Sequence, residues 1–287
     1  MCDELIHPGL VEDHRLSRRN FGLLTAAMAG TASMAMAQSN VTEKDVDVKT
    51  PDGVADSVLF TPNGNGSWPA VLIWTDIMGL RPAFRDMGRR LAALGYVVLV
   101  PNPFYRSAKG PVIGASFDFS QPEGRAKLQS FRQAMGDEGS DKDAKAYLGF
   151  LDAQPQTNKS RKAGVQGYCM GGSLSFRTAA AVPDRIAAVG SFHGGNGLVT
   201  KEANSPHLLI AKTNASFVVC QAQNDDATAP TMKDDLKAAF TAAKKTATVE
   251  VYAANHGWCV PGGAVYNQAE AERAWTNLTN LYKSTLA

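Results

Sequence analysis

The sequence is poor in several features that mark particular classes of protein. Among its 287 residues there are only four cysteines and five histidines, and no two cysteines form a Cys-x-x-Cys pair. This excludes a disulfide framework and provides no zinc-site spacing. The formal net charge is +2, and no run of basic residues marks a face for nucleic acid. We therefore expect no metal, no organic cofactor and no nucleic-acid partner.

Long hydrophobic runs are also missing after residue 37, where no apolar stretch approaches the roughly 20 residues of a membrane-spanning helix. Residues 1–37 differ, because "LSRRNFGLLTAAMAGTASMAMAQS" combines two arginines, a weakly hydrophobic Ala/Gly-rich run and a small-x-small ending. This combination is typical of a twin-arginine signal peptide that is removed on export. We expect residues 38–287 to act in the periplasm or outside the cell. A cytoplasmic leader helix is the alternative.

The composition is that of a globular α/β protein. Hydrophobic residues make up 44% and charged residues 20% of the sequence, which is enough for a sizeable core. No repeat and no linker interrupts residues 38–287, which we interpret as one domain. Runs that are apolar on both faces predict the strands of a buried parallel sheet, and they occur at 70–74, 96–101, 162–168, 186–192, 216–222 and 247–253.

Helical patterns separate these runs. A proline opens the first and a glycine ends it, and the patterns occupy 82–95, 172–182, 231–245 and 266–286, with a longer helical crossover at 122–153. Before them, alternating residues around Pro51-Asp52-Gly53 predict an antiparallel hairpin at the sheet edge. The alternation of strands and helices predicts a single three-layer α/β domain with a mostly parallel sheet.

A cysteine occupies the sharpest turn that the sequence predicts. The stretch "GVQGYCMGG" ends the strand at 162–168, and Gly167-x-Cys169-x-Gly171 has the spacing of a nucleophile elbow with Cys in place of Ser. Glycines permit such a bend, and the amino end of the following helix favours a thiolate. Cys169 is therefore a candidate nucleophile. A buried structural cysteine on a glycine-rich turn is the alternative.

Two further candidate groups follow later strands. In "QNDDATAP", Asp226 or its neighbour Asp225 could orient a histidine, although both could be solvated loop acids. His256, in "ANHGWCVPGG", could act as a general base or be an ordinary loop histidine. Cys169, Asp226 and His256 stand in the nucleophile–acid–base order of the α/β-hydrolase fold, so we predict this triad. Asp225 remains the alternative acid.

An acyl-transfer site also needs two backbone N–H groups that bind the oxyanion. We expect one from Met170, directly after the nucleophile, and one from Ile77 in the loop "TDIMGL". Asp76 in the same loop is expected near the nucleophilic sulfur. His193 and Trp258 are expected to line the pocket, although His193 could equally be a satisfied histidine at a strand end.

Taken together, these motifs resemble the dienelactone hydrolase family over roughly residues 68–286. The resemblance rests on "AVLIWTDIMGL", "LAALGYVVLVPNPFYR", "GVQGYCMGG", "QNDDATAP", "NHGWCVP" and "YNQAEAERAWTNL". It implies an α/β-hydrolase fold whose Cys–His–Asp triad opens enol-lactones by acyl transfer to sulfur. It also implies that Asp76 replaces a family glutamate that holds the resting thiol, and that Arg106 binds a substrate carboxylate. A second substrate arginine of the family, expected near Val260, is missing here.

These observations predict a hydrolase that cleaves a lactone or a small activated ester through Cys169. The alternatives are a general carboxylesterase of the same fold, or a protein of another class, either a non-catalytic binding protein or a redox thiol protein. The expected partner is a small-molecule ester or lactone, and the oligomeric state is left open. Three cysteines follow residue 37, an odd number, so at least one should be free.

Overall fold

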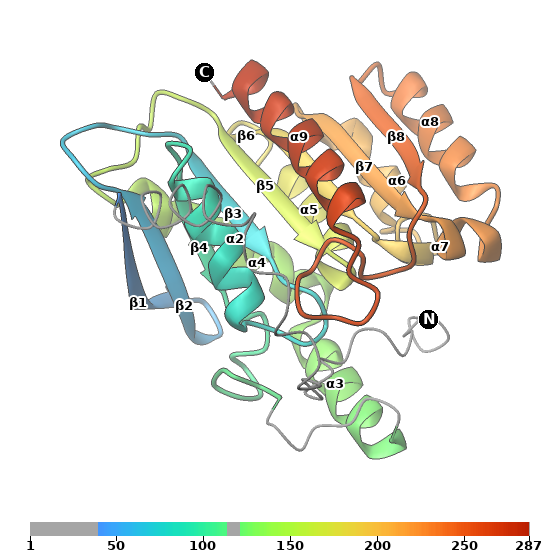
Figure 1. The fold of residues 1–287 in the computed structure, drawn as a ribbon, viewed down its shortest axis with the longest axis horizontal. Helices are drawn as coiled ribbons and strands as arrows, with labels where there is room; N and C mark the ends of the chain where they lie inside the picture. Colours follow the sequence, from blue (N-terminus) through green and yellow to red (C-terminus); the bar gives the residue numbers. More distant parts are fainter. Residues whose placement is uncertain (1–39, 114–120, 287) are drawn as a thin grey trace, which may run out of the picture.

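The six apolar runs of the sequence and the N-terminal hairpin form one eight-stranded sheet (Figure 1). The computed structural model describes residues 40–113 and 121–286, so the expected signal peptide at 1–37 lies outside the described residues. Neighbouring strands follow the order β1-β2-β4-β3-β5-β6-β7-β8. The strands are β1 (Val41–Thr50), β2 (Gly53–Pro62), β3 (Ala70–Trp74), β4 (Val97–Pro101), β5 (Ala163–Tyr168), β6 (Ile186–Phe192), β7 (Ser216–Ala222) and β8 (Ala247–Tyr252).

The sheet is mostly parallel, with an antiparallel hairpin at one side. The strands β3 to β8 pair in parallel, whereas β2 pairs antiparallel with both β1 and β4. Every residue of β3, β4 and β5 is buried, because these central strands are covered on both faces. The expected parallel sheet and its N-terminal hairpin are confirmed.

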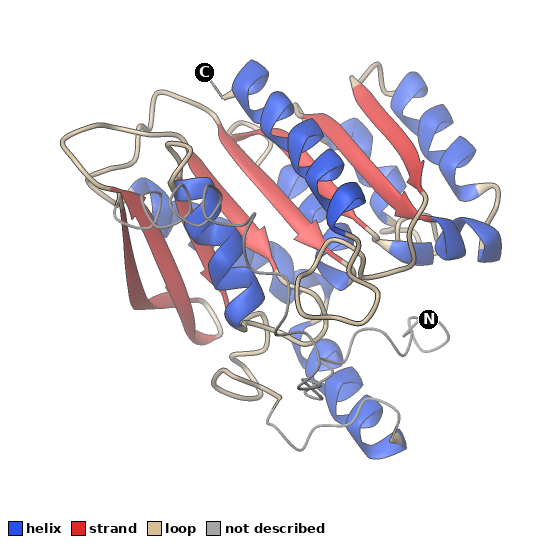
Figure 2. Cartoon of the chain, in the orientation of Figure 1, coloured by secondary structure: helices blue, strands red, loops and turns tan. Residues whose placement is uncertain are grey.

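Helices cover both faces of the sheet and so produce three layers (Figure 2). One buried cluster contains side chains of α2 and α9, and a second contains side chains of α4, α5 and α8. No helix within the described ranges is long and apolar enough to cross a membrane. The α-helices are α2 (Pro82–Ala92), α3 (Pro122–Met135), α4 (Asp137–Asp152), α5 (Met170–Ala181), α6 (Pro206–Leu209), α7 (Gln223–Thr228), α8 (Met232–Ala242) and α9 (Gln268–Thr285), and the 3₁₀ helices are η2 (Gly195–Gly197) and η3 (Ile210–Lys212).

Two segments differ from the sequence-based expectation. The crossover before β5 contains two helices, because Gly136 ends α3 in a left-handed conformation with a φ of 56° and α4 begins at the next residue. After β7, the segment that contains Asp225 and Asp226 forms the short helix α7 where a loop was expected. Neighbouring residues on a helix point about 100° apart, so these two carboxylates meet different partners.

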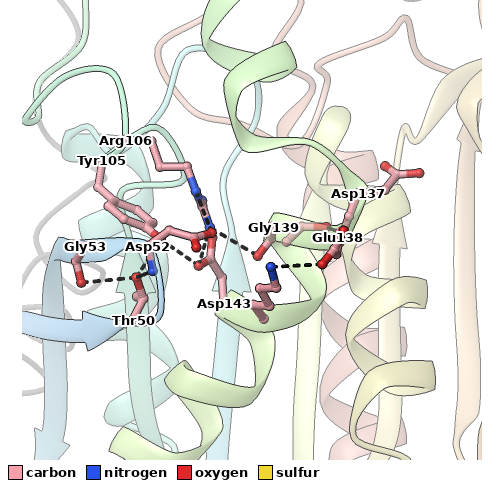
Figure 3. Close-up of polar contacts among 11 residues, drawn as sticks. Thr50, Asp52, Gly53, Tyr105, Arg106, Asp137, Glu138, Gly139 and Asp143 are labelled. Carbon is pink, nitrogen blue, oxygen red and sulfur yellow. Dashed lines mark hydrogen bonds and ion pairs between the residues drawn. The ribbon is translucent and has the colours of Figure 1, made fainter.

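Arg106, in the loop after β4, ties the N-terminal hairpin to the helical layer (Figure 3). Its guanidinium binds Asp143 of α4 and Asp52 of the hairpin turn, each at 2.7 Å. The hydroxyl of Tyr105 donates to the same Asp143 carboxylate at 2.7 Å and lies 2.6 Å from the Thr50 hydroxyl. Asp143 is fully buried and Arg106 nearly so, so each charge depends on the other for compensation.

Replacing the buried partner should therefore cost more than the loss of a surface ion pair. We expect Asp143→Ala to lower the free energy of unfolding by about 3 kcal/mol, because it leaves the Arg106 charge inside without its main partner. Urea titration of the purified protein measures this change. Glu138→Ala is the matched control, because Glu138 lies on the same helix and forms an exposed pair with Lys142. Equal effects of the two substitutions would contradict the structural role of Arg106.

Candidate active site

The ends of several parallel strands bring their following residues to one edge of the sheet. The loop at 75–81 follows β3, Cys169 follows β5, His193 follows β6, helix α7 follows β7, and the loop with His256 follows β8. Ligands of open α/β sheets bind outside the carboxyl ends of the strands, so this edge is the expected place for a site.

Cys169 occupies a strained bend between β5 and α5. Its φ of 52° and ψ of −117° lie in a region that residues with a side chain seldom adopt. The chain on either side approaches so closely that a Cβ atom at Gly167 would lie 1.8 Å from the carbonyl oxygen of Gly171. Only glycine fits there. The bend is the elbow that the sequence pattern predicts, and it leaves Cys169 half-buried between fully buried neighbours.

The two residues expected to bind an oxyanion belong to segments at this bend. Met170 is the first residue of α5, so its N–H is one of the amides that have no acceptor within the helix. The loop after β3 passes directly against the elbow, since a Cβ atom at Gly171 would lie 2.6 Å from the Thr75 carbonyl oxygen. That loop carries Ile77, which is buried. The two residues expected to bind an oxyanion thus belong to segments in contact with each other.

His256 joins the cysteine to a carboxylate. Its Nδ1 donates to the Oδ2 atom of Asp225 over 2.7 Å, and Cys169 is close enough to raise the pKa of the imidazole. Asp225 is fully buried and His256 is 3% exposed. Asp225 and His256 therefore form a hydrogen-bonded pair that is mostly shielded from solvent.

The acid that contacts His256 is Asp225, so the prediction of Asp226 was wrong by one residue. Asp226 faces away and binds the Lys233 ammonium group of α8 at 2.8 Å and 3.0 Å. The sequence could not show which of the two acids faces His256. This segment was expected to be a loop, whereas it is a helix, and the geometry of the helix decides which side chain points towards the histidine. The alternative that the sequence left open is the one that contacts His256.

Two further residues of α7 hold the histidine loop, and the sequence analysis did not identify them. The Asn224 side-chain oxygen accepts the His256 backbone N–H at 2.8 Å. The Gln223 backbone N–H donates to the carbonyl oxygen of Ala254 at 3.0 Å. An amide residue one or two positions before a candidate acid was the signal available in "QNDD", but amides are frequent in turns and carry little information alone.

The charges around His256 favour its protonated form. Burial alone would lower the pKa of His256, but the negative charge of Cys169, the hydrogen bonds to Asp225 and Cys169, and the charge of Asp225 raise it to about 10. At neutral pH this imidazole therefore carries a proton opposite the sulfur.

His193 and Trp258 lie beneath the site and do not line a pocket, because both side chains are fully buried. The Trp258 ring stacks on Tyr252 at 5.2 Å between ring centroids and meets His193 edge to face at 5.3 Å. Neither residue therefore lines a pocket, but His193 does contact the nucleophile, because its Nδ1 accepts the Cys169 backbone N–H at 3.1 Å. Large aromatic side chains close to a strand end fill the core more often than they face a ligand.

Asp76 is occupied by a partner that the sequence analysis did not consider. Both of its oxygens accept from the Arg81 guanidinium, at 2.6 Å and 2.7 Å, and one also accepts the Met78 backbone N–H. Asp76 is fully buried. The expectation that this carboxylate holds the nucleophilic sulfur is replaced by a buried ion pair within the loop itself.

Arg106 likewise forms ion pairs with acids of the protein itself. Its donors are bound by Asp52 and Asp143, as Figure 3 shows, so the guanidinium serves the anchoring of the hairpin and not a substrate carboxylate. The implied role of Arg106 in substrate binding is corrected accordingly. The resemblance alone could not reveal this, because the two acids come from distant parts of the sequence.

A cavity of about 520 Å³ lies beside the site and not on it. It is lined by residues of β1, β2, the start of α2 and the loop at 109–111, among them Arg81 and Asp56. Cys169 and His256 are not among the lining residues. The acyl-transfer chemistry that the sequence suggests would therefore take place at the elbow, outside this cavity.

The remaining sulfur atoms and possible metal ligands add no second centre in the part of the chain that the structure describes. Cys169, Cys220 and Cys259 are all free thiols. Within residues 40–113 and 121–286, no group of three or more His, Cys, Asp or Glu side chains could hold a metal ion.

Known proteins share both the sequence pattern and the architecture. Residues 55–286 match the sequence model of the dienelactone hydrolase family. A carboxymethylenebutenolidase of Rhodococcus opacus is 27% identical over 178 residues, which cover 62% of this chain and 65% of that protein.

Solved structures agree on the fold. A dienelactone hydrolase-like promiscuous phosphotriesterase from metagenomic libraries has a TM-score of 0.71 at 22% identity, over 86% of this chain and 100% of that one. A dienelactone hydrolase from Anabaena variabilis has a TM-score of 0.61 at 16% identity, with the same coverage of both chains. The family resemblance of the motifs is thereby confirmed, and the chain belongs to the dienelactone hydrolase family, a family of hydrolases with the α/β-hydrolase fold.

Proposed function

We propose that this protein hydrolyses a lactone or a small activated ester through a covalent intermediate on Cys169. The observation that carries the proposal is the buried hydrogen bond between Asp225 and His256, next to the half-buried Cys169, whose charge raises the pKa of the imidazole. A nucleophile, a base and an orienting acid in contact are the recurring arrangement for acyl transfer.

In the first half of the reaction, the sulfur attacks the acyl carbon of the substrate. The attack converts the carbonyl group into a tetrahedral oxyanion. This oxyanion can accept hydrogen bonds from the backbone N–H groups of Met170 and Ile77. When the tetrahedral intermediate collapses, the C–O bond to the leaving group breaks. The protonated His256 then supplies the proton that the departing alkoxide or enolate requires, which leaves an acyl thioester on Cys169.

In the second half, water releases the acid. Neutral His256 takes a proton from a water molecule, whose oxygen attacks the thioester carbon and displaces the Cys169 sulfur. The carboxylic acid departs, and the imidazolium opposite the sulfur is restored. Asp225 accepts from Nδ1 throughout, so it keeps the other ring nitrogen directed at Cys169.

The ion pairs of Arg106 affect which substrates the protein could bind. Because its guanidinium is neutralised by Asp52 and Asp143, a negatively charged acyl group gains nothing from it. Position 260 holds a valine in place of a second cation. These features favour an uncharged lactone or ester over a substrate with a free carboxylate, and a carboxylesterase of broad substrate range is compatible with them.

The expected signal peptide at residues 1–37 leads to a second proposal, on location. The twin-arginine pattern favours export of the folded protein to the periplasm or the medium. Immunoblotting of the periplasmic fraction, with Arg18→Lys/Arg19→Lys as the comparison, tests it. Equal export of the two forms would contradict it.

The first prediction from this proposal concerns the sulfur. We expect Cys169→Ala to abolish hydrolysis of p-nitrophenyl acetate, because it removes the sulfur that receives the acyl group in the proposed mechanism. Pre-treatment of the wild-type protein with iodoacetamide should have the same effect. Continuous absorbance of released p-nitrophenolate measures both rates.

Two outcomes of that assay separate the competing functions. Cys220→Ala is the matched control, because this thiol is buried and should leave the rate near that of the wild type. Turnover that survives in Cys169→Ala would refute the thiol mechanism. Stoichiometric alkylation of Cys169 without any wild-type turnover of esters or lactones would instead favour a binding or redox protein.

The second prediction compares two neighbouring acids. Asp225→Asn should lower kcat by about 10⁴-fold, because an amide cannot hold His256 in the required tautomer. Asp226→Asn should leave kcat close to the wild-type value, since it breaks only the contact with Lys233. Steady-state kinetics on both variants decide the assignment, and a larger loss from Asp226→Asn would overturn it.

A further inference from the structure

His193 stands directly beneath the elbow in an unusual conformation. It follows β6, its side chain is fully buried, and its φ of 38° lies in the left-handed region. Its backbone N–H donates to the Cys220 carbonyl oxygen of β7 at 2.8 Å. Strained backbone of this kind persists where surrounding contacts enforce it, and it is concentrated at functional sites.

The ring of His193 contacts the backbone of the nucleophile. Its Nδ1 accepts the Cys169 backbone N–H at 3.1 Å, and the same N–H is shared with the Phe192 carbonyl oxygen at 3.0 Å. Because Nδ1 is an acceptor, the proton of a neutral ring must reside on Nε2. That Nε2 atom is buried and has no hydrogen-bond partner among the described residues.

The same ring also packs against the catalytic histidine. The centroids of His193 and His256 are 4.8 Å apart at an interplanar angle of 62°, and Trp258 closes the other side at 5.3 Å. Burial lowers the pKa of His193 well below its usual range, and the positive charge of His256 lowers it further. His193 therefore stays neutral and keeps its acceptor beside a protonated neighbour.

We infer that His193 is a positioning residue of the thiol site: its neutral ring holds the Cys169 amide at the strained elbow and fixes the plane of the His256 imidazole. This inference rests on the proposed function. A histidine with only a structural role in the core would have hydrogen-bond partners for both ring nitrogens. Here Nε2 has no partner among the described residues, and Nδ1 accepts the backbone N–H of Cys169.

Two amide substitutions distinguish the hydrogen-bond acceptor at Nδ1 of His193 from the volume that its ring fills. In His193→Asn, the side-chain oxygen can take the place of Nδ1, and asparagine tolerates a positive φ. In His193→Gln, the amide reaches instead to the position of Nε2, so polarity and volume remain while the acceptor for Cys169 is displaced. The pair thus tests the Nδ1 contact itself.

We expect His193→Gln to lower kcat for p-nitrophenyl acetate by about 100-fold with little change in KM, because a misplaced nucleophile slows the chemical step. His193→Asn should recover most of that loss. The pH at which Cys169 reaches half its maximal rate of alkylation by iodoacetamide should rise in His193→Gln and stay near the wild-type value in His193→Asn. A residue that only supports the fold would not divide the two variants in this way.

Tyr252→Phe is the matched control for packing. Tyr252 belongs to the same aromatic group, where it stacks on Trp258 and accepts from Asn277. This variant should lower the melting temperature and leave kcat and the alkylation profile unchanged. Melting temperatures of all variants show whether the rate losses follow stability.

The outcomes also separate this inference from the proposed function. If the wild-type protein shows turnover that depends on Cys169, and His193→Gln and His193→Asn lose activity equally or not at all, the role of His193 is refuted while the function stands. If the wild-type protein shows no such turnover, the proposed function fails first, and an alkylation profile that is the same in all three proteins refutes the positioning role as well.

Discussion

The contact between the His256 imidazole and the buried Asp225 carboxylate is the interaction on which the rest of the site depends. At 2.7 Å and shielded from solvent, it fixes which ring nitrogen faces Cys169 and stabilises the charge that the ring carries. Burial alone lowers the pKa of a histidine, and the hydrogen bond and charge of Asp225 act with Cys169 to raise the pKa of His256. Helix α7 and the loop after β8 hold the pair through Asn224.

Two other buried ion pairs contain residues that the sequence suggested for the site. Arg81 neutralises Asp76 within the loop that carries Ile77, and Arg106 joins the hairpin to α4 through Asp143. Each pair neutralises a charge that the sequence suggested for the site. The same residue types that suggest ligand contacts in the sequence thus form ion pairs inside the protein.

The sequence predicted the sheet, its hairpin and the elbow because these depend on local patterns: solid apolar runs, a turn signal and glycines around Cys169. The sequence-based predictions were wrong where the role of a residue depends on a partner that is distant in the chain. Asp226 was preferred to Asp225 because the direction of a short helix is not visible in one dimension. Arg106 was assigned to a substrate because its partner acids at 52 and 143 are distant in the chain. Trp258 was placed in a pocket because its burial depends on the packing of α2 and α9 against the sheet, which the sequence does not reveal.

Trapping of the acyl-enzyme tests the central claim most directly. The protein would be mixed with p-nitrophenyl acetate, quenched in acid within the first turnovers and analysed by peptide mass spectrometry. The account predicts one acetyl group on the peptide that contains Cys169, which disappears when the substrate is exhausted. Continued turnover with that peptide unmodified at every time, or with the acetyl group on a different side chain, would contradict it.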